Sequence, residues 1–307
     1  MSSKIHLLNR KITRAILLLF LCLIAFKSHG QLNPFQSIFY QNRYLLNPAL
    51  AGINKGLNIN ANYRQQWNSF PGAPKTAQVS GDIAATDKVG LGLNIINDES
   101  GILRTTRVVG SYAYHLRLTE SDDRHLSFGL SMGMNNSRVD YNKVQGDATD
   151  EQIAQYNQLK PYLDGDLGIA YTDSHWLISG TLPDLSSAIL KTSDSRFNTN
   201  QLQFIGSIAY KFGLNSEINV FSYEPVVAYR VIKGYTNILD VGVNLGLTNY
   251  GVNIQALYHT NKNISAGLGI DLKSLILLFN YNFETGTIST YTNGAFELGM
   301  KFKLFDK

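Results

Sequence analysis

The chain has 307 residues, of which only 16% are charged, a low fraction for a soluble protein. Its formal net charge is +4, but residues 1–30 hold five of the 27 Lys and Arg and none of the 23 acidic residues, so the remainder carries 22 against 23, or about −1. This balance argues against a nucleic-acid-binding protein.

Residues 1–30 have the features of a secretory signal peptide. Basic residues precede the apolar run AILLLFLCLIAF (Ala15 to Phe26), and Ser28-His29-Gly30 offers a small-x-small cleavage site. We predict cleavage near Gly30; a retained signal anchor is the alternative. The single cysteine, Cys22, lies in the apolar run, so the predicted mature chain has no disulfide and no thiolate metal site.

From about Gly56 onward, roughly fourteen segments alternate between apolar and polar residues, each near the ten residues that a tilted strand needs to cross a bilayer. The segment Ile264 to Phe283 is long and apolar enough to suggest a membrane helix, but Asp271 and Lys273 lie at its centre. It is better read as two strands joined at Lys273-Ser274. The clearest other strands are 89–95, 108–118, 126–134, 167–171, 202–212, 223–231, 239–247, 252–258 and 296–304.

One face of these segments is almost wholly aliphatic and aromatic, and the other carries charged and polar residues of both signs. A soluble β-sandwich also alternates, but one domain rarely needs fourteen such strands. A barrel in lipid, apolar outside and polar inside, explains both features. We therefore predict an all-β fold, a transmembrane antiparallel β-barrel of about 14 strands in the outer membrane, with residues 1–30 as signal peptide, 31–55 as a periplasmic lead-in or plug segment, and 56–307 as the barrel.

The predicted connections alternate in length. With a periplasmic N-terminus, the periplasmic turns are short, whereas the outer connections include 68–75, 98–105, 136–161, 183–200 and 284–294. This alternation is typical of outer-membrane barrels. Two outer connections, near Gly234 and Asn261, are short and weaken the pattern slightly.

The sequence offers little sign of catalysis or of a cofactor. The four histidines after residue 30 are scattered, so no metal site is predicted. His125 and Ser127 share one strand face and could form a base and a nucleophile, but Leu126 and Phe128 claim the lipid face, which turns the pair toward the lumen. A structural role is favoured, and we predict that the chain is not an enzyme and binds no cofactor.

Two N-terminal stretches, FYQNRYLLNPALAG (Phe39 to Gly52) and YRQQWNSFPGAPKT (Tyr63 to Thr76), resemble the opening of the PorP/SprF family, outer-membrane proteins associated with type IX secretion in gliding and related bacteria. VGLGLNIINDESG (Val89 to Gly101) and FELGMKFKLF (Phe296 to Phe305) are similar to later parts of the family, whereas 290–295 departs from it. The resemblance runs from about Gln36 to the end. The motif residues that match are Asn47, Pro48, Gly52, Tyr63, Arg64, Trp67, Phe70, Pro71, Gly72 and Pro74.

The resemblance implies a partner-binding role: an accessory of type IX secretion that docks, secretes or retains a large surface adhesin through the adhesin's C-terminal signal domain. The implied partners are outer-membrane lipid, that adhesin and other type IX secretion components, with no nucleic acid. The alternative function is an outer-membrane diffusion porin or transporter. The stretch Leu46 to Ala49 could fold inward as a turn-rich plug, with Pro48 fixing the turn and Gly52 freeing it, or could be a mere lead-in.

The longest predicted outer connection, Asn136 to Pro161, is long enough to carry a function. Its apolar positions Ile153, Tyr156 and Leu159 have near-helical spacing, which predicts a short amphipathic helix capped at Thr149 or Asp150. Such a helix could dock a partner above the barrel mouth, or the connection could be a solvated loop that only shields it.

Overall fold

A computed structural model describes residues 38–67, 71–119, 123–144, 150–186, 202–212, 221–233, 236–285 and 294–305. The predicted signal peptide and Phe70 lie outside the described residues.

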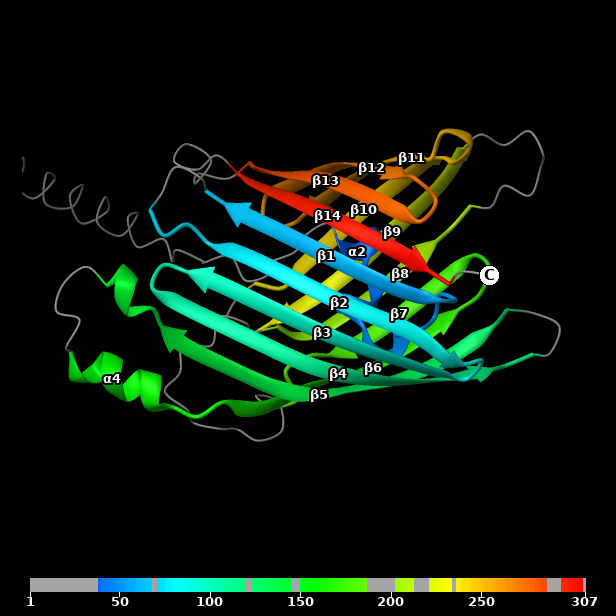
Figure 1. The fold of residues 1–307 in the computed structure, drawn as a ribbon. Helices are drawn as coiled ribbons and strands as arrows, with labels where there is room; N and C mark the ends of the chain where they lie inside the picture. The colour runs from blue at the N-terminus through cyan, green and yellow to red at the C-terminus, as the bar shows by residue number, and fades with distance from the viewer. Residues whose placement is uncertain are drawn as a thin grey trace, which may run out of the picture. The chain divides into compact units, whose positions relative to one another are not determined.

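Fourteen antiparallel strands form one closed barrel, in which each strand pairs with its neighbours in sequence and β1 pairs with β14 (Figure 1). This confirms the predicted fold class and strand number. The strands are β1 Leu57–Gln66, β2 Lys75–Thr86, β3 Val89–Ser100, β4 Leu103–Arg117, β5 His125–Val139, β6 Tyr162–Thr172, β7 Trp176–Leu182, β8 Leu202–Tyr210, β9 Phe221–Ile232, β10 Ile238–Leu247, β11 Val252–His259, β12 Asn263–Asp271, β13 Leu275–Glu284 and β14 Ala295–Leu304.

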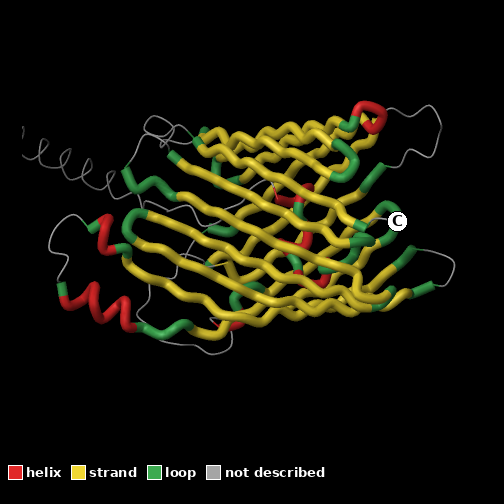
Figure 2. The backbone as a smooth tube through the Cα atoms, in the orientation of Figure 1, coloured by secondary structure: helices red, strands yellow, loops and turns green. Residues whose placement is uncertain are grey.

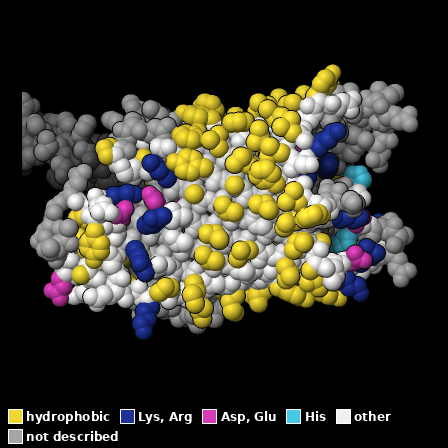
Figure 3. Space-filling view, in the orientation of Figure 1, with side chains coloured by type: hydrophobic (Ala, Val, Ile, Leu, Met, Phe, Trp, Pro, Cys, Tyr) yellow, Lys and Arg dark blue, Asp and Glu magenta, His cyan; other side chains and the backbone are white. Residues whose placement is uncertain are grey.

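The two faces of the strands divide as the alternation predicts. On β4, Tyr112 and Tyr114 are exposed on the outside of the barrel, whereas Ser111, Ala113 and His115 are buried inside it. Apolar side chains are spread over the outer surface between its two ends, and the charged side chains lie mainly at the ends (Figure 3). Since side chains at successive positions point to opposite faces, a strict apolar/polar alternation places one set in lipid and the other in the lumen.

The segment Ile264 to Phe283 forms two strands, as predicted. β12 and β13 pair along their length, and Lys273 in the turn between them has a positive φ of 71°. Ile264, Leu268 and Phe279 are exposed on the outside, and Asn280 is buried inside.

Two predicted connections have different bounds in the structure. The outer connection expected at 98–105 is only a two-residue turn, because β3 and β4 stay paired as far as Ser100 and Leu103. In the longest connection, β5 continues to Val139, after which come the 3-10 helix η2 (Tyr141–Lys143) and the helix α4 (Glu151–Gln158). The Asp150 side chain caps α4 by accepting a hydrogen bond from the Gln152 N–H, which confirms the predicted helix and one of its two predicted caps.

Before β1, the chain forms three short helical turns among the strands (Figure 2). They are α2 (Ile38–Gln41), α3 (Arg43–Leu46) and the 3-10 helix η1 (Pro48–Leu50). Residues 38–53, named the lumenal segment below, contact inward-facing residues of many strands. None of the helices in the described parts of the chain has the length and apolarity of a bilayer-spanning helix.

Candidate functional site

Asn47 is the central anchor of the lumenal segment. Its side chain is fully buried, and its Nδ2 donates to the carbonyl oxygens of Ile169 and Gly180, at 3.0 and 3.1 Å. Its Oδ1 accepts the Ala49 N–H at 2.8 Å, which caps η1, and Pro48 occupies the first position of that helix, where its missing N–H costs nothing. One side chain therefore both starts a local turn and fastens it to β6 and β7.

The barrel wall makes room for this turn with glycines. A Cβ atom at Gly129 of β5 would lie 2.1 Å from the Ala49 nitrogen, and one at Gly168 of β6 would lie 1.9 Å from Asn47 Oδ1. Real side chains do not tolerate such distances. The close approach of the segment therefore requires glycine in both strands.

The end of the lumenal segment is held by an acid and a histidine from the wall. Gly52, with a positive φ of 67°, donates its N–H to Asp82 Oδ2 at 3.1 Å. His115 Nε2 lies 3.0 Å from the Ala51 carbonyl oxygen and its Nδ1 lies 2.8 Å from Ser127 Oγ. The histidine beside Ser127 is thus His115 and not His125. Because the second ring nitrogen of His115 contacts the backbone of the lumenal segment, this pair has a structural role.

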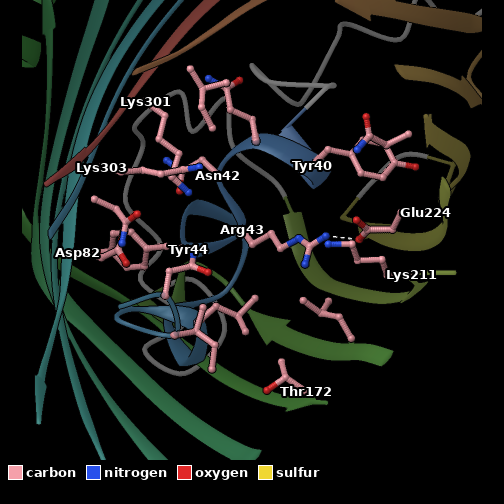
Figure 4. Close-up of a pocket in the computed structure, with 18 of the residues that line it drawn as sticks. Tyr40, Asn42, Arg43, Tyr44, Asp82, Thr172, Lys211, Glu224, Lys301 and Lys303 are labelled. Carbon is pink, nitrogen blue, oxygen red and sulfur yellow. Dashed lines mark hydrogen bonds and ion pairs between the residues drawn. The ribbon is translucent and has the colours of Figure 1, made fainter. Parts of the chain in front are cut away.

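The first half of the segment adds further polar anchors. Tyr44 OH lies 2.9 Å from Ser111 Oγ, and Asn42 Nδ2 donates to Ser80 Oγ at 2.9 Å. Burial raises the pKa of the Tyr44 phenol to about 12, so the group stays protonated. Arg43 forms an ion pair with Glu224, which Figure 4 shows crossing from the segment to β9.

A polar cavity of about 680 Å³ lies beside the lumenal segment (Figure 4). The cavity is lined by residues at the short turns, such as Asp123 and Asp173. It therefore lies toward the periplasmic end of the barrel. Its charged lining is mixed: Arg43, Lys55, Lys211, Lys301 and Lys303 face Asp82, Asp123, Asp173 and Glu224. An ion-selective pore usually shows a clear excess of one sign, whereas this cavity has five basic residues against four acidic ones.

The inward-facing charges predicted from the sequence largely pair with one another. Arg107 reaches Asp164 at 2.6 Å and Asp166 at 2.9 Å. The other pairs are Arg64 with Glu297 at 3.3 Å, Arg230 with Asp240 at 2.6 Å, and Lys303 with Asp271 at 3.3 Å. Arg117 is exposed at the end of β4, and Lys211, directly after β8, is exposed where it lines the polar cavity.

The tyrosine, arginine and tryptophan of the second motif point in different directions. Arg64 faces inward to Glu297, whereas Tyr63 lies on the outer face, where its ring packs 6.2 Å from that of Phe296. Trp67 has a positive φ of 49° and donates from Nε1 to Glu284 at 2.8 Å. Trp67 therefore ties the end of β1 to β13, and these three residues do not form one partner-facing patch.

Three outer connections are joined by backbone hydrogen bonds. Gly101 N–H donates to the Gly72 carbonyl at 2.9 Å, and Asp140 N–H donates to the Ile102 carbonyl at 2.8 Å. Pro71 and Gly72 are exposed and Pro74 is half-buried. The turn at Gly101 and Ile102 therefore links the first outer loop to the connection that carries α4.

Helix α4 is fastened to the end of β5 by Asn157, whose side chain donates to the Val139 carbonyl at 3.0 Å and accepts the Val139 N–H at 2.7 Å. The apolar positions Ile153, Tyr156 and Leu159 are half-buried, and the fully exposed positions are polar or acidic. The surface that α4 offers is therefore more polar than its sequence pattern suggests.

Asp82, His115, Gly129 and Gly168 hold the lumenal segment, although the sequence alone does not predict them as site residues. The sequence feature that could have indicated Gly129 and Gly168 is their inward-facing position within strands. A glycine in a strand often marks the close approach of another backbone. Within the described ranges, no three His, Cys, Asp or Glu side chains gather as a metal site would require.

A closed antiparallel barrel with an apolar outer face and a polar, paired lumen is an outer-membrane β-barrel. Residues 28–302 match the family model described as type IX secretion system membrane protein PorP/SprF, and the chain belongs to this family.

The chain is similar to solved structures at low sequence identity. The structure titled CymD monoaromatic hydrocarbon channel is 11% identical, with a TM-score of 0.54 over 91% of this chain and 96% of that one. The Acinetobacter baumannii outer membrane protein Omp33 is 8% identical, with a TM-score of 0.47 over 82% and 100%. No curated protein sequence matches this chain.

Proposed function

We propose that this barrel is a docking accessory of type IX secretion that receives or retains a large secreted adhesin, through the adhesin's C-terminal signal domain, at the outer surface. The observation that carries the proposal is the lumenal segment: its family-motif residues Asn47, Pro48 and Gly52 are committed to hydrogen bonds and close contacts that hold a stretch of chain inside the lumen. We infer that this segment acts as a plug. A plugged barrel serves better as a platform than as a channel.

The outer connections supply the surface for docking. Hydrogen bonds from the Gly101 N–H to the Gly72 carbonyl and from the Asp140 N–H to the Ile102 carbonyl link two outer connections. These are the loop of Pro71, Gly72 and Pro74 and the connection with Ile153, Tyr156 and Leu159. A partner that contacts both would meet one continuous rim. Trp67 and Arg64 support this rim from β1 by holding Glu284 and Glu297.

The plug is tested by conductance in planar bilayers. The wild-type barrel should conduct poorly, and a variant lacking residues 38–53 should form larger and steadier channels, because the segment fills part of the lumen. A wild-type conductance equal to that of the deletion variant would favour the alternative, a diffusion porin or transporter.

The docking surface is tested in cells by display of the adhesin. Replacing Gln152 to Leu159 with a Gly/Ser linker should reduce display while the barrel still folds, since the connection crosses no membrane. Leu272→Ser with Lys273→Gly, in the exposed turn at the opposite rim, is the matched control and should leave display unchanged. Normal display in the linker variant would exclude α4 and leave the Pro71–Gly72 loop as the next candidate.

A further inference from the structure

Four outward-facing residues form a row across β2 to β5 near the outer end of the barrel. In the strand register, Lys75 pairs with Glu99, Glu99 pairs with Arg104, and Arg104 pairs with Arg138. Each has the same parity as the exposed apolar residues lower on its strand, such as Val79, Ile95, Val108 and Met134. The row therefore lies on the outside of the barrel and not over its mouth.

The row is strongly basic, and one further lysine joins it. Lys143 of η2 reaches Glu99 at 2.9 Å and lies 3.9 Å from Asp140. Lys75, Arg104, Arg138 and Lys143, named the basic rim cluster below, thus face two carboxylates and leave a surplus of two positive charges. Figure 3 shows basic side chains gathered at this end of the outer surface.

The two arginines of the cluster oppose each other directly without a carboxylate between them. Arg104 Nε donates to Asn97 Oδ1 at 2.9 Å and lies 3.5 Å from Glu99, while its side chain is 56% exposed. Arg138 is exposed and forms no ion pair with any described residue. Like charges directly opposite on a sheet are destabilising. Glu99 offsets the charge of Arg104, but no described carboxylate pairs with Arg138, so an added anion would stabilise the pair.

The height of the cluster identifies the source of that anion. The outward apolar band on β4 and β5 runs from Leu116 and Leu126 to Val108 and Met134, which is about 27 Å along the strands and about 20 Å along the membrane normal at a strand tilt of about 40°. Arg104 and Arg138 lie four residues beyond the edge of this band, or about 10 Å along the normal. This is the level of the lipid headgroups.

The opposite side of the barrel differs at its outer end. There Tyr258, Ile264 and Phe283 are the exposed outward residues near the strand ends of β11 to β13. Lys233 and Lys262 are also exposed at outer strand ends. Among the described residues, the sector of β2 to β5 therefore differs in gathering four basic side chains together.

We propose that the basic rim cluster binds the phosphate groups of an anionic glycolipid in the outer leaflet. Guanidinium groups bind phosphate through paired charge-assisted hydrogen bonds, and a phosphate between Arg104 and Arg138 would remove their repulsion. The acyl chains of the same lipid would lie on the apolar residues below, Val108 and Met134. Arg104 and Arg138 face the membrane, and none of the cluster residues lies in the segment Gln152 to Leu159 that the docking test replaces.

The probe is bisphosphorylated lipid A added to the folded barrel in detergent, compared with the same lipid A after removal of its phosphates. Native mass spectrometry measures the bound fraction at each concentration. The wild type should bind the phosphorylated form roughly tenfold more tightly, since each lost charge-assisted contact weakens binding by about that factor. Arg104→Gln with Arg138→Gln should abolish the difference, and Arg104→Lys with Arg138→Lys should keep most of it.

Lys88→Gln with Lys273→Gln is the matched control, because it removes two exposed positive charges at the opposite rim and should leave lipid binding unchanged. Gel mobility without heating shows that each variant is folded; if the double glutamine variant fails to fold, Arg138→Gln alone replaces it. Equal wild-type binding of both lipid forms, or an unchanged preference in the glutamine variant, would overturn the proposal. Displacement of the lipid by equimolar soluble polyglutamate would also overturn it, in favour of an acidic protein partner.

Discussion

The lumenal and outer faces of the same strands obey different rules. On β4 and β5, the inward residues Ser111, His115 and Ser127 each bond to a defined partner, and Gly129 is fitted to the lumenal segment. On the outside, Leu116, Phe128 and Met132 need only be apolar, because lipid adapts to their shapes. The lumen is therefore specified by complementarity and the outer face by polarity, and the two faces should respond differently to substitution.

The largest difference is expected for charge. Arg107 contacts Asp164 and Asp166 inside the barrel, so Arg107→Met should cost about 3–5 kcal/mol by leaving two carboxylates unpaired. Arg104→Met, three residues away on the outer rim, should cost less than about 1 kcal/mol in detergent free of lipid. Urea unfolding followed by fluorescence measures both. Adding Asp164→Asn and Asp166→Asn should restore much of the loss, and no recovery would contradict the pairing argument.

Two adjacent residues of β10 allow the same substitution to be compared on the outer face and in the lumen. Val243 lies on the outer face between the exposed Val241 and Leu245, whereas Asn244 lines the polar cavity. Val243→Arg should cost about 2–4 kcal/mol near the middle of the membrane, and Asn244→Arg should cost little. The folded fraction in lipid vesicles, read from mobility on an unheated gel, measures the effect. Equal losses would show that the assigned faces are wrong.

Glycine substitutions test shape without charge. Gly129→Ala would bring a methyl group against the Ala49 backbone and should cost about 1–3 kcal/mol. Gly110→Ala on the outer face is the control: its Cβ meets nothing closer than 4.0 Å, so stability should be unchanged or slightly higher. Unfolding midpoints in urea distinguish the two. A neutral Gly129→Ala would mean that the lumenal segment yields easily to the wall.

The smallest effect is expected for the two tryptophans. Trp67→Phe removes the hydrogen bond to Glu284 and should cost about 1 kcal/mol. Trp176→Phe should be nearly neutral, because Trp176 contacts Tyr210 edge to face on the outside and phenylalanine can keep that contact. Circular dichroism during urea unfolding serves for both variants. A larger loss for Trp176→Phe than for Trp67→Phe would contradict the argument from the Glu284 hydrogen bond.

Membrane-embedded parts of the strands were easier to predict than their outer ends. Between Leu126 and Met134, large apolar residues alternate with serine and glycine because lipid lies on one side and the lumen on the other. Beyond the apolar band, both faces meet a polar environment, so Asp98, Glu99 and Arg104 resemble a loop in sequence although they continue the ladder of β3 and β4. The helix α4 was predictable because Asp150 caps it locally, but its anchoring on Val139 by Asn157 depends on a contact 18 residues apart in sequence.

The sequence by itself determined the barrel, its strand number and its family, because alternation in lipid is a local signal repeated fourteen times and the motifs are contiguous. Only the tertiary structure decided what fills the lumen. Asn47 bonds to residues more than 120 positions away, and Gly129 and Gly168 matter only because that turn lies against them. The same holds for Arg104 and Arg138, which become a like-charged pair only through the register of β4 and β5.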